Sequence, residues 1–600
     1  MRIFVLGAAV LAIGMSAKAL DPSPAALRAT EAYVPASLST YVQPESSPLR
    51  ELVDRFTADK ADLVRFYSVK GSTLQTRRLR EFYRAWLDRL EAMDFSSLGV
   101  EGRIDATLLK GEIGYELKLL DRSEAQAREI AVLVPFAEDI ASLQESRRLM
   151  QPVDPQGSAT ALGRMTVSIH AVQHRLDLGL SGKPPAAGEK AEPLKVTPVM
   201  AARALHSIAD LQKALDDWDK TYDSYDPAFT WWTHKTFDEL KTALKGYTTY
   251  LHETVLGVKA GADEPIIGDP IGREGLQVEL DHEMIPYSPE QLIDIANREF
   301  AWCDVELKKA SHEMGFGDDW KAALEKVKQD HLAPGEQPML VRRLALEAMD
   351  FVRARNLVTI PPLSADVWNI VMMPPEQQKV APFFLGGPDI LVAFPTDTMD
   401  VDDKNQSLRS NNVHFARATV FHELVPGHHL QFFYLARYNQ HRELFMTPFW
   451  VEGWALWWER YLWDLGFPQT PEDKMGMLFW RAHRCARIIF SLNFHTGKWT
   501  PEQCVDFLVD RVGHDRFSAT GEVRRSFNGA WSPLYQAGYM IGSLQISALH
   551  RDLVTTGKMT DQQFHDSILK GGPMPIEMVR ARLENTKIPV NFKPTWKFAN

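Results

Sequence analysis

The sequence predicts a large, mainly α-helical protein with two lobes and a small β element. Apolar residues recur at three-to-four spacing through most of the 600-residue chain, for example in residues 76–93 and 289–314, and charged residues lie between them. Period-two alternation, which indicates strands, is scarce. Residues 381–397 differ from the rest of the chain, because β-favouring residues lie there between Gly and Pro. They predict one or two short strands in this region.

The first 19 residues have the pattern of a cleavable secretion signal. Arg2 precedes an apolar stretch from Ile3 to Met15, and the Ala-Lys-Ala that ends at Ala19 fits the small-residue rule for signal peptidase. An uncleaved anchor is the alternative, but the apolar stretch is shorter than the roughly 20 residues that a spanning helix needs. No cysteine follows the site, which disfavours a lipoprotein, and no later stretch is apolar enough to span a bilayer. We therefore expect a secreted or periplasmic protein.

Two segments rich in Pro, Gly and charge divide the helical pattern. Residues 181–198 predict a surface loop, and residues 261–275 predict the join between the lobes. The expected N-terminal helical lobe is therefore 20–270, and the expected C-terminal lobe is 271–600. Both lobes together could still form a single domain of one family.

Composition excludes some partners. The net charge of -11 is spread over mixed-sign segments without a run of Lys or Arg, so neither a nucleic acid nor an anionic membrane surface is favoured. Only Cys303, Cys485 and Cys504 are present, so at most one disulfide can form. Cys485 and Cys504 are the nearer pair in sequence, and buried free thiols are the alternative.

The segment FHELVPGHHL, residues 421–430, starts like a zinc-binding HExxH motif. Apolar residues upstream of it predict a buried helix that turns His422 and Glu423 inward. A neutral histidine nitrogen can bind zinc, and the adjacent carboxylate can take a proton from water at the metal. The two residues therefore predict a metal ligand and a general base.

The second histidine of the motif is displaced. Pro426 stands four residues after His422, and the next histidines are His428 and His429. In an ideal helix His429 would share the face of His422 but lie roughly 10.5 Å further along the axis, whereas His428 would point about 240° away. Pro426 and Gly427 predict a local distortion. A bulge in the Val-Pro-Gly segment could bring His428 to the ligand position.

Glu452 is the candidate for the third metal ligand. It lies in a well-bounded predicted helix, with Thr447 as N-cap, Pro448 in the first turn and Gly466 after the end. A carboxylate among so many aromatic residues is costly unless it is paired or bound to a metal. Glu459, two turns further along, is expected to support a ligand or to pair with an arginine. Other residues of this region are expected to be packed or surface residues: His414, His483, Trp450, Trp454, Trp457 and Trp458.

The motifs HELVPGHHLQ and VEGWALWWE resemble the bacterial domain-of-unknown-function family 885, whose pattern is HExxPGHHxQ followed by EGWA and which is similar to the gluzincin metallopeptidases. The resemblance covers roughly residues 280 to 590 by motif. It implies a gluzincin-like helical body with Zn²⁺ as cofactor. It also implies His422, His428 and Glu452 as zinc ligands and Glu423 as general base, with His429 as the reserve ligand.

Two further motifs are similar to the family. SLNFHTGKWTPEQ matches a family segment at His495, but Ser491 and Asn493 stand where the family usually has Asp and Gly, so a carboxylate that orients His495 is expected to be missing. LYQAGYMIG places Tyr539 at the family tyrosine. Related gluzincins hold the oxyanion with a tyrosine or histidine. The resemblance therefore implies Tyr539 first, His495 second and Tyr535 third, although each could be an ordinary buried residue.

The sequence thus predicts an exported zinc metallopeptidase that hydrolyses peptide bonds of short peptides. Two alternatives stay open. The first is a zinc hydrolase of another amide or an ester. The second is a non-catalytic periplasmic binding protein with a degenerate metal site, which the departures at Ser491 and Asn493 favour.

Overall fold

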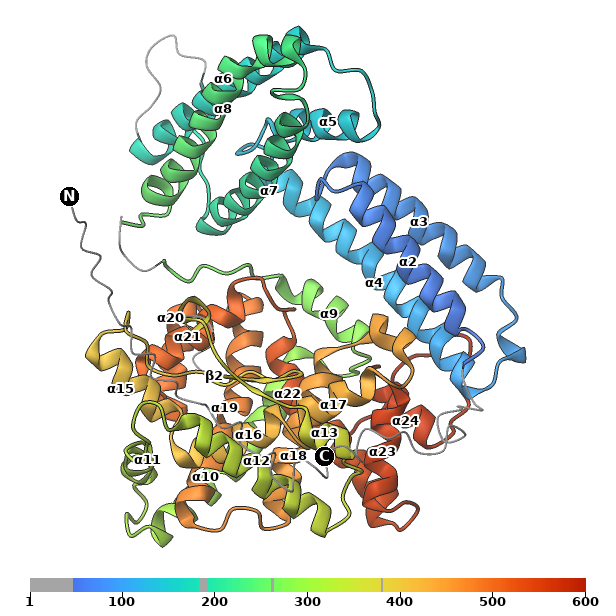
Figure 1. Ribbon diagram of the computed structural model, residues 1–600, viewed down its shortest axis with the longest axis vertical. Helices are drawn as coiled ribbons and strands as arrows, with labels where there is room; N and C mark the ends of the chain where they lie inside the picture. The colour runs from blue at the N-terminus through green and yellow to red at the C-terminus, as the bar shows by residue number, and fades with distance from the viewer. Residues whose placement is uncertain (1–46, 183–190, 260–263, 379–380, 382, 600) are drawn as a thin grey trace, which may run out of the picture.

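The computed structural model describes residues 47–182, 191–259, 264–378, 381 and 383–599 (Figure 1). The predicted signal peptide, residues 1–19, lies outside these ranges. As predicted, the described part is mainly helical, and its only sheet has two short strands. Among the described helices, none has the length and apolar character needed to cross a bilayer.

The N-terminal half forms two groups of helices, coloured blue and teal to green in Figure 1. In the second group, Asp154, Thr197 and Asp226 each cap a helix that starts with proline, which gives three long helices clear N-termini. The first group is α2 (Arg50–Phe66), α3 (Thr73–Glu91), a 3-10 turn (Phe95–Ser97) and α4 (Val100–Ile130). The second group is α5 (Ala137–Arg148), α6 (Pro155–Ser181), α7 (Pro198–Tyr222), α8 (Pro227–Tyr250) and the π-helical turn η3 (Leu251–Val255).

The buried apolar residues form separate cores. Helices α5 to α8 enclose a core of their own, which includes Trp218 and Tyr247. Buried residues of α2 to α4, such as Phe56 and Ile104, belong instead to one large cluster with the C-terminal helices. The predicted lobe boundary at residue 270 falls in the extended segment before α9, and the division into lobes stays a prediction.

The C-terminal half packs around α19, whose residues are almost all buried. Its first helices are α9 (Gly272–His282), α10 (Pro289–Glu313), α11 (Trp320–Lys328), α12 (Gln337–Ala354), α13 (Pro362–Asp366), α14 (Pro375–Gln378) and α15 (Val401–Ser410). Next come α16 (Val413–Glu423), α17 (His428–Leu435), η4 (Gln440–Phe445), α18 (Pro448–Asp464) and α19 (Pro471–His495). The last are α20 (Pro501–Phe507), η5 (Leu508–Val512), α21 (Arg516–Phe527), α22 (Tyr535–His550), η6 (Arg551–Thr555), α23 (Asp561–Gly571) and α24 (Ile576–Leu583).

The predicted β element lies beside α16. Strand β2 (Ile390–Val392) falls inside the predicted region, residues 381–397. It pairs in parallel with β1 (Ile370–Met372), a strand that the sequence pattern did not predict. Apolar side chains of β2 share a small core with Ala416 and Val420 of α16. The element therefore covers one side of the helix that carries the HE pair.

Helices α18 and α22 approach each other closely at two glycines. A Cβ on Gly453 would lie 2.7 Å from the Cα of Gly542, and a Cβ on Gly542 would collide with the carbonyl of Phe449. Only residues without a side chain allow this separation. The close contact places Glu452 of α18 next to the first turns of α22.

The three cysteines are free and buried, so the alternative of buried thiols holds rather than a disulfide. The Cys504 thiol contacts the carbonyl of Phe490 at 3.8 Å, and Cys485 interacts with Cys303 instead of Cys504. Burial raises the pKa of Cys504 to about 12. These thiols therefore behave as small apolar core groups.

Candidate metal centre

The HELVPGH segment joins two separate helices. Helix α16 ends at Glu423, the Val425–Pro426 peptide bond is cis, and α17 begins at His428. The Gly427 amide donates to the carbonyl of Phe421 at 3.0 Å, and a Cβ at Gly427 would collide with the carbonyl of His422. The distortion occurs where the sequence predicts it, but it is a full break rather than a bulge, because Pro426 cannot continue the helical hydrogen bonds.

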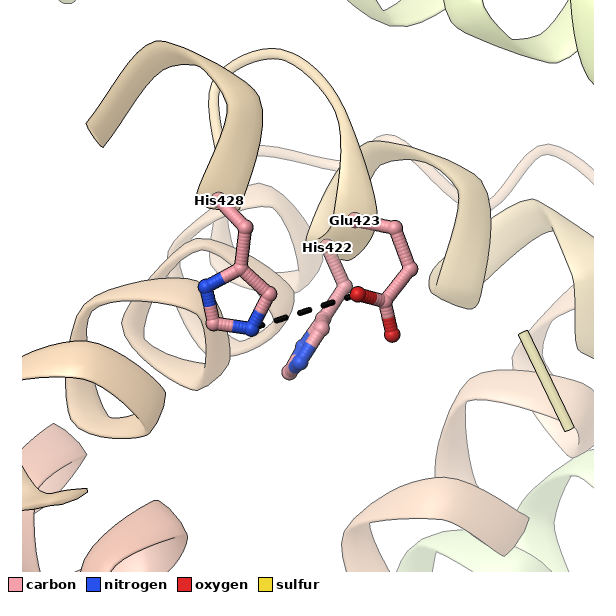
Figure 2. A group of neighbouring side chains, drawn as sticks. All are labelled: His422, Glu423 and His428. Carbon is pink, nitrogen blue, oxygen red and sulfur yellow. Dashed lines mark ion pairs between the residues drawn. The ribbon is translucent and has the colours of Figure 1, made fainter. Parts of the chain in front are cut away.

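The break turns His428 toward His422 (Figure 2). The two rings are nearly perpendicular, with centroids 4.9 Å apart. His422, Glu423 and His428 are all buried, and one ligand atom from each lies within 4.8 Å of the others. The Nε2 atom of His428 is 4.0 Å from Oε2 of Glu423, the contact drawn dashed in Figure 2. These residues form a candidate metal site.

Glu452 approaches the same point from α18. Its Oε2 lies 3.6 Å from Nε2 of His422 and 3.2 Å from Nε2 of His428. The helix begins as predicted, because the Thr447 side chain accepts a hydrogen bond from the Trp450 amide and proline follows. Either Glu452 or Glu423 can thus complete a set of three donors with the two histidines.

The other nitrogen of His422 is held by a carboxylate. Nδ1 of His422 lies 2.6 Å from Oε1 of Glu459, and the same oxygen accepts from Arg484 Nη2 at 3.3 Å. A proton on Nδ1 leaves the Nε2 lone pair free to bind a cation, as in carboxylate–histidine–zinc sites. On His428, Nδ1 faces Gln431 Oε1 at 3.5 Å. The donor set therefore fits a zinc ion. Glu459 thus contacts both a candidate ligand, His422, and an arginine, Arg484, the two kinds of partner expected from the sequence.

The carboxylates of Glu423 and Glu452 differ in proton affinity. Burial raises the pKa of Glu423. Burial acts on Glu452 in the same direction, but its contacts with His428 and His422 dominate and hold its pKa well below the usual range. Burial alone would lower the pKa of His422, whereas hydrogen bonds with Glu452 and Glu459 raise it to about 9. Glu452 is therefore an ionised ligand candidate, and Glu423 is the carboxylate better suited to hold and release a proton.

Two tyrosines of α22 border this group. The hydroxyl of Tyr535 donates a short hydrogen bond to Oε1 of Glu452 and lies 3.1 Å from the hydroxyl of Tyr539. The Tyr539 ring runs parallel to the His422 ring, with centroids 6.1 Å apart. Tyr535, the third oxyanion candidate from sequence, is thus the tyrosine that contacts a candidate ligand, and Tyr539 lies one helical turn further on.

A cavity of about 550 Å³ opens beside the metal candidates. Its apolar wall includes Phe383, Leu385, Phe432, Val451, Trp480 and Trp531. Its polar wall includes the two candidate ligands His422 and His428, Glu423, Glu452, both tyrosines and the three arginines Arg484, Arg487 and Arg525. Sequence reasoning missed the arginines. The available signal was the pair Arg484 and Arg487, one helical turn apart and with mostly apolar residues on either side in the sequence.

His429 points away from the cavity. Its Nδ1 lies 2.8 Å from the carbonyl of Pro388 and its Nε2 lies 2.9 Å from the carbonyl of Ser364. Both ring nitrogens are therefore used to hold α17 against the segments before β1 and β2. The structure brings His428, and not His429, to the metal candidates.

His495 does not reach the cavity either. It ends α19, two turns beyond Arg487, and its ring contacts Phe494 and Phe527. Burial lowers its pKa to about 4. The structure thus does not bring His495 near the oxyanion position that the family resemblance implies, because α19 carries it past the site.

Ser491 and Asn493 bind their own helix. The Ser491 hydroxyl donates to the carbonyl of Arg487 at 2.6 Å, and the Asn493 amide donates to the carbonyl of Ile489 at 2.9 Å. Neither side chain lines the cavity. Their departure from the family pattern therefore leaves the candidate metal centre itself intact.

The other residues of this region are packed as expected. His414 lies 2.8 Å from Asp473 and 3.0 Å from Asp330, and His483 contacts His514 at 2.8 Å. Four tryptophans are buried in the helical core rather than on the cavity wall: Trp450, Trp454, Trp457 and Trp458.

A family model described as "Bacterial protein of unknown function (DUF885)" matches residues 67–583. The chain belongs to this family. The match confirms the resemblance of the HExxPGHHxQ and EGWA motifs. Among curated proteins, none matches this DUF885 chain.

Two solved structures share the DUF885 chain's fold. One is described as "a putative lipoprotein of unknown function from Shewanella oneidensis"; it is 18% identical, with a TM-score of 0.62, over 90% of this chain and 100% of that one. The other is "the putative lipoprotein from Colwellia psychrerythraea", 15% identical, with a TM-score of 0.55, over 86% of this chain and 91% of that one.

Proposed function

We propose that this DUF885 protein is an exported, zinc-dependent metallopeptidase that hydrolyses peptide bonds of short peptides. The convergence of two histidine Nε2 atoms and the Glu452 carboxylate beside Glu423, in one buried cavity, supports this proposal most strongly. Two histidines and one glutamate are a donor set of catalytic zinc sites. The predicted signal in residues 1–19 and the description of two similar structures as lipoproteins support export.

His422, His428 and Glu452 would hold the zinc. When bound, zinc supplies Lewis acidity, which polarises a carbonyl and lowers the pKa of water. Glu423 then accepts a proton from the attacking water and passes it to the leaving amine, a role that its raised pKa favours. The Tyr539 hydroxyl is the donor proposed for the oxyanion of the tetrahedral intermediate.

The cavity supports small substrates. A volume of about 550 Å³ lies within the range of sites for small molecules, and the metal candidates are buried in its wall. Short peptides fit such a space, whereas an intact folded protein does not.

The direct test is metal analysis of purified protein combined with a quenched-peptide library. We expect one bound zinc and cleavage by the wild type, with cleavage lost and zinc kept in Glu423→Gln. Absence of zinc would refute the metal centre. Zinc without Glu423-dependent cleavage of any peptide would refute the peptidase and leave hydrolysis of another amide or ester, or binding alone.

A further inference from the structure

Three buried arginines line the cavity next to the metal candidates. Arg484 and Arg487 come from α19, Arg525 comes from α21, and their exposed fractions are 4%, 1% and 7%. A buried guanidinium is costly unless a carboxylate neutralises it and its N–H groups are hydrogen-bonded. The hydrogen-bond and carboxylate partners of each arginine therefore show which of the three has no direct counter-charge in the protein.

Two of the arginines have carboxylate partners. Nε and Nη2 of Arg487 donate to the two oxygens of Glu522 at 2.7 and 3.0 Å. Nη2 of Arg484 donates to Glu459 at 3.3 Å. Even so, Nη1 of Arg487 and Nε of Arg484 are buried without a partner. Both side chains keep donors that protein groups do not use.

Arg525 has no such carboxylate partner. Within the described ranges, no carboxylate oxygen lies within 4.0 Å of its guanidinium, and its hydrogen bond is the one from Nη2 to the Tyr535 hydroxyl at 3.1 Å. Its Cζ lies over the rings of Trp531 and Tyr535, at 5.2 and 5.6 Å. The aromatic faces compensate such a charge only in part. The Arg525 guanidinium thus has no direct carboxylate contact, and the nearby carboxylates of Glu522 and Glu452 act on its charge only at longer range.

This charge lies close to the metal candidates. The Tyr535 hydroxyl contacts Arg525 on one side and Glu452 on the other. An extended residue spans about 3.5 Å. An anionic group bound at Arg525 would therefore lie within about one or two residues of a peptide bond held at the metal.

We propose that Arg525, on a cavity wall that it shares with Arg487, binds the C-terminal carboxylate of a short peptide, so that cleavage occurs close to that end. The inference rests on the proposed peptidase function. A guanidinium matches a carboxylate in shape and charge, and the pair forms short, charge-assisted hydrogen bonds. A free C-terminus supplies this carboxylate in every short peptide, whatever its sequence.

Calorimetric titration of zinc-loaded Glu423→Gln protein tests the inference by binding. The probes are Ala-Phe-Ala as free acid, its C-terminal amide, and Ala-Glu-Ala amide, whose only carboxylate is on the side chain. We expect the free acid to bind at least about tenfold tighter than either amide. Adding Arg525→Gln should remove most of this difference, Arg525→Lys should restore part of it, and the exposed control Arg551→Gln should leave it unchanged.

Three results would overturn the inference. Equal affinity for acid and amide would show that no carboxylate site exists. Preference for Ala-Glu-Ala amide over the free acid would move recognition to acidic side chains. Equal weakening of all probes by Arg525→Gln, with an unchanged near-UV spectrum, would show that Arg525 only positions Tyr535.

Cleavage by the wild type separates this inference from the proposed function. If zinc-loaded wild type cleaves acid and amide equally well, the peptidase stands and the carboxylate site falls. If the free acid binds selectively through Arg525 but is never cleaved, carboxylate binding stands and the peptidase falls.

Discussion

Replacing Glu459 by Gln tests whether the candidate site binds metal through an oriented His422. The substitution keeps the shape and the acceptor oxygen but removes the negative charge that lies 2.6 Å from Nδ1 of His422. Loss of a carboxylate that supports a metal-bound histidine weakens metal binding about 10- to 100-fold, which corresponds to about 1.4 to 2.8 kcal/mol of binding free energy. We expect a weakening in this range for zinc, measured by competition with a chelator of known affinity.

The matched control is Glu299→Gln. Glu299 also pairs with arginines, which are partly buried, at 3.3 Å to Arg460 and 2.8 Å to Arg481, but it does not line the cavity beside the metal candidates. Its replacement should lower stability without changing zinc affinity. Two results would refute the proposed orientation of His422 and show that Glu459 acts through packing. In the first, both variants lose zinc affinity equally; in the second, Glu459→Gln lowers stability but leaves zinc affinity unchanged.

Three further outcomes follow from the structure. His428→Ala should lose zinc, whereas His429→Ala should keep zinc and lose about 1 to 3 kcal/mol of stability, since the buried carbonyl of Ser364 and the partly buried carbonyl of Pro388 lose their partner. Zinc content and chemical denaturation measure the two effects, and the reverse pattern would make His429 the ligand. Gly386→Ala should keep zinc but lower kcat about tenfold or more, because the new Cβ would lie 3.0 Å from the Cα of Glu423; unchanged kcat would contradict this. Burial raises the pKa of Glu283 to about 8 from its ordinary 4.5, so its contribution to stability is complete below about 4.5 and is lost as the pH rises through about 8. Glu283→Gln should therefore raise the unfolding free energy by at least about 1 kcal/mol more at pH 8 than at pH 5, and equal effects at both values would refute the pKa.

Local sequence signals predicted the elements that carry the site. Thr447, Pro448 and Gly466 bound the helix of Glu452 as the structure shows, because capping is a contact within one turn. The pair Pro426 and Gly427 likewise predicted the position of the distortion, because both residues act on the local backbone. Its form as a break brings Gly427 so close to the carbonyl of His422 that a Cβ would not fit, and only the folded backbone reveals this close approach.

Tertiary contacts decided what the sequence left open. The choice of His428 over His429 depends on carbonyls of residues 364 and 388, which lie far away in the chain. Arg525 meets Tyr535 because α21 and α22 fold together, and no periodicity within either helix signals that contact. The resemblance placed His495 near the site by motif alone, but the length of α19 carries it beyond the cavity wall.

The roles proposed for Glu423, as general base, and for Glu452, as zinc ligand, rest on their neighbours rather than on burial, which both share. Glu452 lies 3.2 Å from His428 and 3.6 Å from His422 and accepts a hydrogen bond from Tyr535, so three contacts stabilise its charged form. Glu423 has one such contact, with His428 at 4.0 Å, and its pKa is raised. A ligand must stay ionised, whereas a base must accept a proton. The same buried cluster therefore offers one carboxylate suited to each proposed role, and exchanging the two roles would require Tyr535 and both histidines to contact Glu423 instead of Glu452.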